Sequence, residues 1–184
     1  GWTGGGGDDD LSGGDGADAL HGGLGDDRLV GGAGQDTLFG GAGDDLLSGL
    51  EDTVDGDPDT QDQNNSDFLN GGDGDDTILA GENDVITGGE GSDTTVLGDW
   101  ITNGETAEVM DFDRDEDALV LVCDLTGDEE PDVEIVDDEG TPGLSYVVVN
   151  GEEIAMLRGA DGLSAEDIVL IDKSAGAAFG LSAA

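Results

Sequence analysis

The chain has 184 residues, of which 47 are Asp or Glu and only 4 are Lys or Arg, giving a formal net charge of −43 at pH 7. This charge repels nucleic-acid phosphates and anionic membrane surfaces, so neither is an expected partner. With 36 glycines and 4% aromatic residues, the composition argues against a large close-packed core and is typical of a disordered acidic chain. Disorder, however, predicts no fixed spacing among the acids.

The acids do have a fixed spacing. A nine-residue unit of the form GGxGxDxUx, in which U is a large apolar residue, runs in tandem through residues 4–48 in five copies. After a polar stretch at residues 49–61, four further copies follow at 62–70, 71–79, 80–87 and 88–96, and three of these are decayed. A short period of this kind indicates a solenoid in which every unit contributes one strand.

Each position of the unit has a physical reason. Glycines at positions one, two and four are expected to allow positive φ and close stacking of turns, and Asn65 and Asn83 replace the fourth glycine in decayed units. The side chain at position eight should point inward. This predicts a thin core formed by Leu11, Leu20, Leu29, Leu38, Leu47, Leu69, Ile78 and Ile86.

Position six carries a carboxylate in every unit. Stacked turns lie about 4.8 Å apart, so bare carboxylates at this position repel one another. Calcium takes about six to eight hard oxygen ligands and tolerates irregular geometry, whereas magnesium demands a tighter octahedron and fits less well. The pattern therefore predicts a chain that is disordered without calcium and folded with it. The carboxylates are Asp9, Asp18, Asp27, Asp36, Asp45, Asp67, Asp76, Asp84 and Asp93.

These nonapeptides resemble the parallel β-roll of RTX (hemolysin-type calcium-binding repeat) proteins, a family typically exported by type I secretion. The resemblance implies two units per turn, with several calcium ions stacked between GGxGxD loops. It places Asp9, Asp27, Asp45, Asp76 and Asp93 along one edge, and Asp18, Asp36, Asp67 and Asp84 along the other. Loop carbonyls are the other implied ligands, at Gly4, Gly6, Gly13, Asp15, Gly22, Leu24, Gly31, Ala33, Gly40, Ala42, Gly71 and Asp73.

The composition changes after the last unit. Short apolar bursts at 108–112, 118–122, 133–136, 144–149, 153–157 and 168–171 are separated by turn signals such as Asn150-Gly151. A final coil would otherwise leave a bare strand edge, so residues 97–172 are predicted to form a small antiparallel β cap. Ser164 is the candidate N-cap of a helical turn over 163–167. The aromatic residues of this region, Trp100, Phe112 and Tyr146, are expected in its core.

The stretch 109–121 resembles the "DF…D.L.L" segment that commonly follows RTX repeats. Its four alternating acids, at 111, 113, 115 and 117, could hold one more ion or form a solvated loop. The acids of the 49–61 insert could likewise hold an ion or form a solvated loop, and the solvated loop is the preferred interpretation. Residues 173–184 are expected to form a flexible tail that contributes to a C-terminal export signal.

No constellation for catalysis is present. His21 is the only histidine and Cys123 the only cysteine, so neither a disulfide within the chain nor a zinc cluster is expected. Nucleophile-elbow, phosphate-loop and HExxH motifs are absent, and no apolar run is long enough to span a membrane. The chain is therefore predicted not to be an enzyme.

The sequence predicts an all-β protein with a parallel β-roll solenoid of about nine units over 1–96, a cap over 97–172 and a tail over 173–184. The predicted function is a secreted, calcium-binding module that folds when it meets calcium after export, with the type I secretion apparatus as an implied partner. Two alternatives remain. One is a stand-alone extracellular adhesive, surface or calcium-sequestering protein, and the other is the C-terminal region of a secreted enzyme whose catalytic domain lies upstream.

Overall fold

The computed structural model describes residues 1–50, 66–98, 100–101, 105–127 and 129–174. Within these residues the predicted all-β class is confirmed, since the regular structure consists of strands and one short 3-10 turn. The acids predicted in the insert and the residues of the tail beyond Ser174 lie outside the described ranges. No helix in the described part of the chain is long and apolar enough to cross a membrane.

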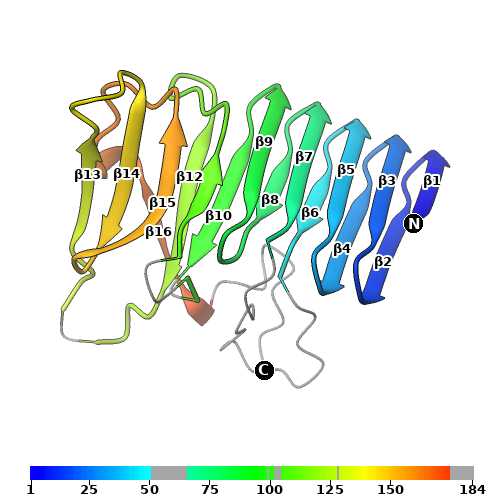
Figure 1. Ribbon diagram of the computed structural model, residues 1–184, viewed down its shortest axis with the longest axis horizontal. Coiled ribbons are helices and arrows are strands. Elements are labelled where there is room, and N and C mark those ends of the chain that lie inside the picture. Colours follow the sequence, from blue (N-terminus) through cyan, green and yellow to red (C-terminus); the bar gives the residue numbers. More distant parts are fainter. Residues whose placement is uncertain (51–65, 99, 102–104, 128, 175–184) are drawn as a thin grey trace.

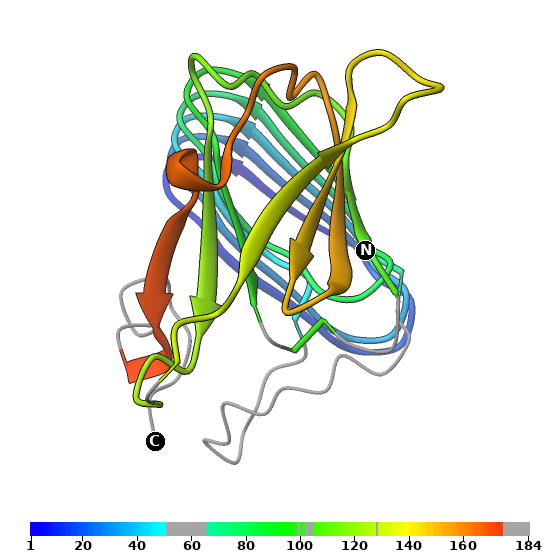
Figure 2. The same cartoon turned by 90° about the vertical axis from the view of Figure 1, so that its left-hand side faces the viewer.

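The strands form two sheets that face each other (Figures 1 and 2). The first sheet has the order β1 (Trp2–Gly6), β3 (Ala19–Leu24), β5 (Thr37–Ala42), β7 (Phe68–Asp73), β9 (Val85–Glu90), β11 (Ala107–Val109), β15 (Glu152–Arg158), β14 (Leu144–Val149) and β13 (Val133–Asp137). The second has the order β16 (Val169–Asp172), β12 (Ala118–Cys123), β10 (Thr94–Gly98), β8 (Thr77–Leu79), β6 (Leu46–Ser48), β4 (Arg28–Ala33) and β2 (Asp10–Asp15).

Consecutive nonapeptides alternate between the sheets, so each unit stacks in parallel on the next but one, as predicted. Leu20 lies beside Leu38 in the first sheet, and Leu11 lies beside Leu29 in the second. The register survives the insert, because Leu38 lies beside Leu69. Figure 1 shows the coils following one another along the long axis of the molecule.

The core between the sheets is the predicted ladder of position-eight side chains. Leu29, Leu38, Leu47, Leu69, Ile78 and Ile86 are completely buried. Leu11, in the second sheet's terminal strand, is only partly buried. Thr95, which stands where the repeat expects Leu, is also buried. One apolar side chain per unit excludes water from the space between the sheets, but it gives a narrow core.

The glycines, which were predicted to allow positive φ and close stacking of turns, divide into two kinds. Positions two and four do need it: Gly23 has φ 128° and Gly25 has φ 113°, and Asn83 fills the fourth position of its decayed unit with φ 63°. Gly22, at position one, is not in the left-handed region. It is needed for space, because a Cβ there would lie 2.2 Å from the Asp27 Oδ2.

The coil that carries the insert begins earlier than the predicted boundary. Gly49 donates its N–H to the Leu79 carbonyl at 3.0 Å, and Leu50 is buried in the core. These two residues therefore occupy the start of a nonapeptide whose end, Ser66 to Asn70, comes after the insert. The strands on either side of the insert keep the register of the roll.

The region after the last repeat is only partly the antiparallel cap that was predicted. β11 pairs in parallel with β9, and β12 pairs in parallel with β10 and β16, so these strands extend the roll. Only β13, β14 and β15 are joined antiparallel. Trp100 and Phe112 are buried as expected, and the 3-10 turn η1 (Ala165–Asp167) begins after a capping box on Ser164. Apolar alternation predicts a strand but not which partner it pairs with.

Candidate calcium-binding edges

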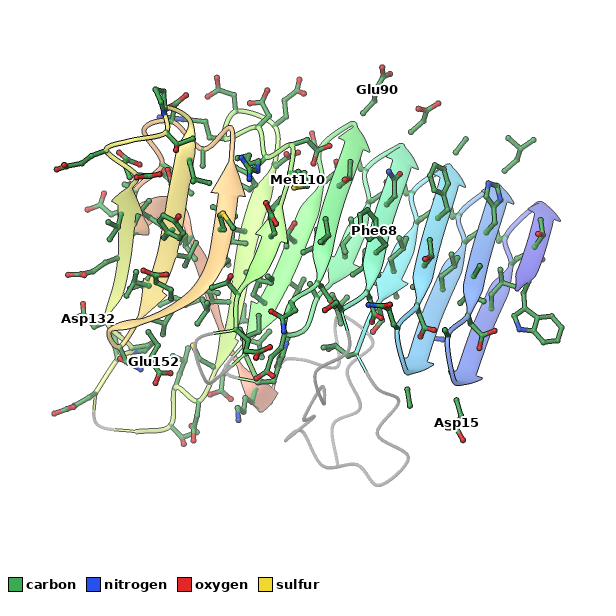
Figure 3. All side chains as sticks on the ribbon, in the orientation of Figure 1. Asp15, Phe68, Glu90, Met110, Asp132 and Glu152 are labelled. Carbon is green, nitrogen blue, oxygen red and sulfur yellow. The ribbon has the colours of Figure 1, made fainter. Side chains whose placement is uncertain are left out.

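The loops between the strands form two rows along the roll. We call the row with Asp9, Asp27, Asp45, Asp76 and Asp93 the upper edge, and the row with Asp18, Asp36, Asp67 and Asp84 the lower edge. Figure 3 shows one labelled loop residue on each, with Glu90 on the upper edge and Asp15 on the lower edge. The structure thus places the position-six carboxylates in the two columns that the RTX resemblance implies.

Within each column, a carboxylate binds the main chain of the preceding coil. The Oδ1 of each Asp accepts a hydrogen bond from the backbone N–H of the previous position-six Asp in its column, at 2.7–3.0 Å. These bonds join residues 18 apart before the insert, such as Asp27 and Asp45, 31 apart across it and 17 apart after it. The ladder therefore uses one oxygen of every carboxylate after the first to fasten two coils together.

The second carboxylate oxygen is buried without a protein partner in six of these residues. They are Asp9, Asp27, Asp36, Asp45, Asp67 and Asp76. A buried carboxylate oxygen that accepts no hydrogen bond costs several kcal/mol unless a proton or a cation compensates it. The structure thus has a repeated need for positive charge along both edges.

The space that these oxygens face is kept open by the position-one glycines. A Cβ on Gly22 would lie 2.2 Å from the Asp27 Oδ2 and 2.7 Å from the Gly40 carbonyl oxygen of the next coil. On Gly71 it would lie 2.0 Å from the Asp76 Oδ2 and 2.6 Å from the Gly88 carbonyl oxygen. Each such space is therefore lined by one carboxylate oxygen and one peptide oxygen.

This donor set fits calcium. In the described residues, no three His, Cys, Asp or Glu side chains converge on one point. Sites built from side chains alone, such as those of zinc, therefore do not match. A hard cation that accepts peptide carbonyls together with single carboxylates does match. Asp27 and Asp45 would supply the charge, and the carbonyls would supply most of the remaining oxygen ligands.

The implied carbonyl ligands occupy two different environments. The carbonyls of Gly22, Gly31, Gly40 and Gly71 lie beside the position-one glycine of the preceding coil, in the space described above. The position-three carbonyls of Leu24, Ala33, Ala42 and Asp73 accept the N–H of a position-four glycine at 2.6–2.9 Å. A carbonyl oxygen has a second lone pair, so this hydrogen bond does not prevent it from binding an ion.

The remaining four implied carbonyl ligands are in the first coil of each edge. Gly4 and Gly6 belong to the first upper loop, and Gly13 and Asp15 to the first lower loop.

Without a bound cation, ionisation of the buried edge carboxylates is energetically unfavourable. Burial raises the pKa of Asp67 to about 8, with the neighbouring Asp84 as the second cause. Burial also raises the pKa of Asp76 and of Asp84 to about 7, and that of Asp93 to about 6. In a medium of low dielectric the ionised form is disfavoured until a cation is close.

One member of the upper column was not identified from the sequence. Asp117 accepts the N–H of Asp93 through Oδ1 at 3.0 Å, so it continues the ladder one coil beyond the last nonapeptide. Its neighbour Asp111 accepts the N–H groups of Gly88 and Gly89. The available signal was the sequence Asp117-Ala118-Leu119-Val120, which repeats the last four positions of a unit without its glycines.

A second row of acids lies on the upper edge alone. Asp26 donates its N–H to the Asp8 Oδ1 at 3.1 Å, and Asp44 and Asp75 repeat this contact along the roll. These position-five side chains are exposed. The corresponding lower-edge residues are Ala17, Gln35 and Ser66, and the shortened unit 80–87 has no fifth position, so the two edges differ in charge.

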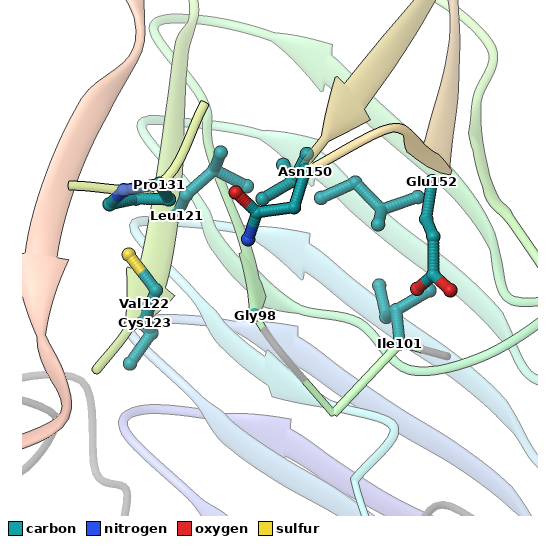
Figure 4. Close-up of a pocket in the computed structure, with 10 residues that line it drawn as sticks. Gly98, Ile101, Leu121, Val122, Cys123, Pro131, Asn150 and Glu152 are labelled. Carbon is teal, nitrogen blue, oxygen red and sulfur yellow. The ribbon is translucent and has the colours of Figure 1, made fainter. Parts of the chain in front are cut away.

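Two other features of the described residues lie away from the acidic columns. His21 stacks on Phe39 with ring centroids 5.4 Å apart, on the first sheet. A cavity of about 120 Å³ lies between β12 and the hairpin of β14 and β15 (Figure 4), and its lining is mainly apolar, including Leu121, Cys123 and Ile154.

Comparisons with known proteins agree with the repeat. The family model for the RTX calcium-binding nonapeptide repeat (4 copies) matches residues 3–38, 21–53, 31–59, 63–95 and 81–99, which together make up about half of the chain. No curated protein matches at a significant level.

Two solved structures are similar over most of the chain. The AlgE6R3 subunit of the Azotobacter vinelandii mannuronan C5-epimerase is 26% identical with a TM-score of 0.43, and the match covers 85% of this chain and 80% of that one. The extracellular lipase LipA of Serratia marcescens is 16% identical with a TM-score of 0.37, and this match covers 90% of the present chain but 38% of the lipase. By the family match and the repeated loops, this chain belongs to the family of RTX calcium-binding nonapeptide repeat proteins.

Proposed function

We propose that this chain is a secreted module whose folding is triggered by calcium. The observation that carries the proposal is the set of six buried carboxylate oxygens without partners, each beside a glycine that leaves room for an ion. Calcium between the coils would turn the repulsion along each column into attraction. Binding free energy would then become folding free energy.

The thin core makes this coupling strong. Each unit buries one large apolar side chain, such as Leu38 or Leu69, while its backbone loses most of its conformational freedom. The apolar surface buried per unit is too small to offset both this entropy and the bare charges. Calcium supplies the missing free energy in the proposed mechanism.

The coupling of calcium binding to folding suits a protein that is exported from the cell. Extracellular calcium modules bind calcium at about 0.1–1 mM, far above the free calcium concentration inside a cell. A chain of this kind would remain unfolded before secretion, in a state suited to passage through a type I secretion apparatus, and would fold outside. The proposal assigns no catalytic chemistry to these residues.

Circular dichroism during calcium titration tests the proposal. The chain in chelator should lack strand signal, calcium should restore it cooperatively, and magnesium at the same concentrations should not. Strand signal that is already complete in chelator would exclude a calcium trigger.

A further inference from the structure

The outer face of the first sheet carries no charge along four successive coils. Positions seven and nine of a unit flank the buried position eight, so their side chains point away from the core. None of these positions in β3, β5, β7 and β9 is acidic, although Asp and Glu make up 47 of the 184 residues. We call these residues the outer patch: Ala19, His21, Thr37, Phe39, Phe68, Asn70, Val85 and Thr87.

The rings of the outer patch are exposed to solvent. Phe39 is 42% exposed and Phe68, labelled in Figure 3, is 55% exposed. The second sheet differs, because Val30, Leu79 and Val96, which occupy position nine there, are buried. Exposed apolar surface that is bordered by polar groups marks binding sites in soluble proteins. Within the described coils, the outer patch is therefore the candidate binding face.

The strand register places rings beside hydrogen-bonding groups. His21 stacks on Phe39 with ring centroids 5.4 Å apart and an interplanar angle of 1°. In the pairing of β5 with β7, Phe39 lies beside Asn70 and Phe68 lies beside Thr37. Rings, an amide and a hydroxyl are thus combined on a surface whose backbone is fixed by the sheet.

A hollow of about 360 Å³ lies on this face, and its lining includes Thr3, His21, Thr37 and Phe39. Binding pockets typically measure about 300–1,000 Å³ and combine apolar walls with a few polar groups. In the register of β1 with β3, the small Thr3 lies beside His21. The imidazole therefore stacks on Phe39 with one face, and no ring of β1 occupies the position next to its other face.

The charge around the patch indicates the class of ligand. Acids such as the exposed Asp26 and Asp44 follow the upper edge, so polyanions are repelled, and a second copy of the chain would bring the same net charge of −43. A cationic partner would be attracted to the edges and not to the uncharged patch. Neutral sugars fit the patch, since their C–H faces pack on aromatic rings while their hydroxyls bond to amide, imidazole and hydroxyl groups.

We propose that the outer patch binds a neutral, extended β-linked glycan whose sugar rings pack on His21, Phe39 and Phe68. An extended chain of flat pyranose rings can follow several coils of a flat sheet, whereas a coiled α-linked chain cannot. The three rings come from three successive strands of the first sheet, so one glycan chain contacts all of them. This binding goes beyond the calcium-triggered folding and requires only the folded roll.

Affinity electrophoresis of the full chain in saturating calcium tests the proposal. Native gels that contain hydroxyethylcellulose, a soluble neutral β-linked glucan, should slow its migration, and free cellohexaose should reverse the effect. Carboxymethylcellulose has the same backbone with negative charges and should retard the chain less. Equal mobility with and without hydroxyethylcellulose would overturn the proposal, and so would stronger retardation by carboxymethylcellulose, which would indicate calcium bridging at the edges.

Matched variants test the role of the rings. Phe39→Leu keeps an apolar side chain but removes the ring, and it should weaken cellohexaose binding in calorimetry by roughly 2–12-fold, the range for one stacked aromatic pair. Phe39→Tyr should retain the affinity. The control Val136→Ala changes an exposed apolar side chain of β13, outside the patch, and should have no effect. Unchanged affinity in Phe39→Leu would refute binding through the rings.

Folding and self-association are checked on the same proteins. Phe39→Leu should keep the strand signal in calcium, because this side chain is exposed; if it does not, Phe68→Leu on the next strand of the sheet provides the same test. A chain that is dimeric by size exclusion, becomes monomeric in Phe39→Leu and is not retarded by hydroxyethylcellulose would assign the patch to contact between copies and overturn the proposal. Strand signal complete in chelator, with glycan binding intact, would contradict the calcium trigger alone.

Discussion

The backbone N–H of Asp9 donates a hydrogen bond of 2.8 Å to the Oδ1 of Asp27, which lies 18 residues later and one coil further along the roll. The Oδ2 of the same Asp27 is buried without a protein partner. One side chain therefore has two separate tasks. Its first oxygen fastens adjacent coils to each other, and its second oxygen faces the space between the loops.

Replacing Asp27 by Asn should separate these tasks. The amide oxygen can still accept the Asp9 N–H, so the roll should fold in saturating calcium, but the charge for the ion is lost. We expect calcium affinity at the adjoining sites to fall at least as much as the roughly 10–100-fold seen when outer-shell groups are removed. Isothermal titration calorimetry would measure this. The control Asp10→Asn changes an exposed acid paired with Arg28, and an equal loss there would show that overall charge alone matters.

The thin core makes the calcium-loaded roll sensitive to single apolar side chains. Leu38 is completely buried and lies between Leu20 and Leu69 of the adjacent coils. Leu38→Ala should lower the free energy of unfolding by about 2–5 kcal/mol, as measured by denaturant titration in calcium. Leu24→Ala, at a side chain that is 64% exposed, should have little effect, and a similar loss there would contradict the assigned interior.

Glycine at position two should tolerate no side chain once another coil lies beneath it. Gly23 has φ 128°, and a Cβ there would lie 2.3 Å from the Gly5 carbonyl oxygen. Gly23→Ala should therefore raise the calcium concentration needed for folding in a circular dichroism titration. Gly6→Ala is the control, because its Cβ would meet nothing within 4 Å. Identical midpoints for the two variants would show that close stacking is unimportant.

Acid should partly replace calcium. In the folded chain burial raises the pKa of Asp67 to about 8, of Asp76 and Asp84 to about 7 and of Asp93 to about 6, from a usual value of 3.8. The fold therefore binds protons that the unfolded chain releases. Their stabilising contribution is fully present below about pH 4 and is lost as the pH rises through 6–8.

Circular dichroism in chelator should accordingly show strand signal increasing as the pH is lowered from 8 to 4. In saturating calcium the signal should stay constant between pH 6 and 8. Calcium affinity should decrease on acidification, because protons compete for the same oxygens. A calcium-free chain that loses structure on acidification would disprove the role assigned to these carboxylates.

The repeat allowed much of this fold to be predicted, because one period of nine residues determines several features at once. Leu29 and Leu38 could be assigned to the interior, and the all-β parallel roll followed from the resemblance that the period supports. The two columns of Asp could also be predicted, because each Asp occupies the same position in its nine-residue unit. Local chemistry and long-range pairing agree in every coil, which makes such a sequence easy to interpret.

Features without a period could not be predicted in the same way. The pairing of β11 with β15, rather than with a hairpin neighbour, depends on contacts between residues far apart in sequence, such as Ala107 and Ala155. The position of Gly49 was missed because its unit is divided by the insert. The role of the position-one glycines also required coordinates, since sequence alone does not distinguish a glycine that needs positive φ from one that leaves space beside a carboxylate.

The arrangement of two nonapeptide units per coil restricts how the length of this protein can change. Because each unit lies on the next but one, adding or deleting a single nonapeptide would exchange the sheets of every later strand, and β12 would no longer meet β10 and β16. Viable insertions or losses within the roll must come in pairs of units, or must lie between Gly49 and Asp67, where the sequence already carries additional residues. Gene rearrangements in this part of the chain are thus expected in steps of 18 codons, which is the sequence separation of its stacked aspartates.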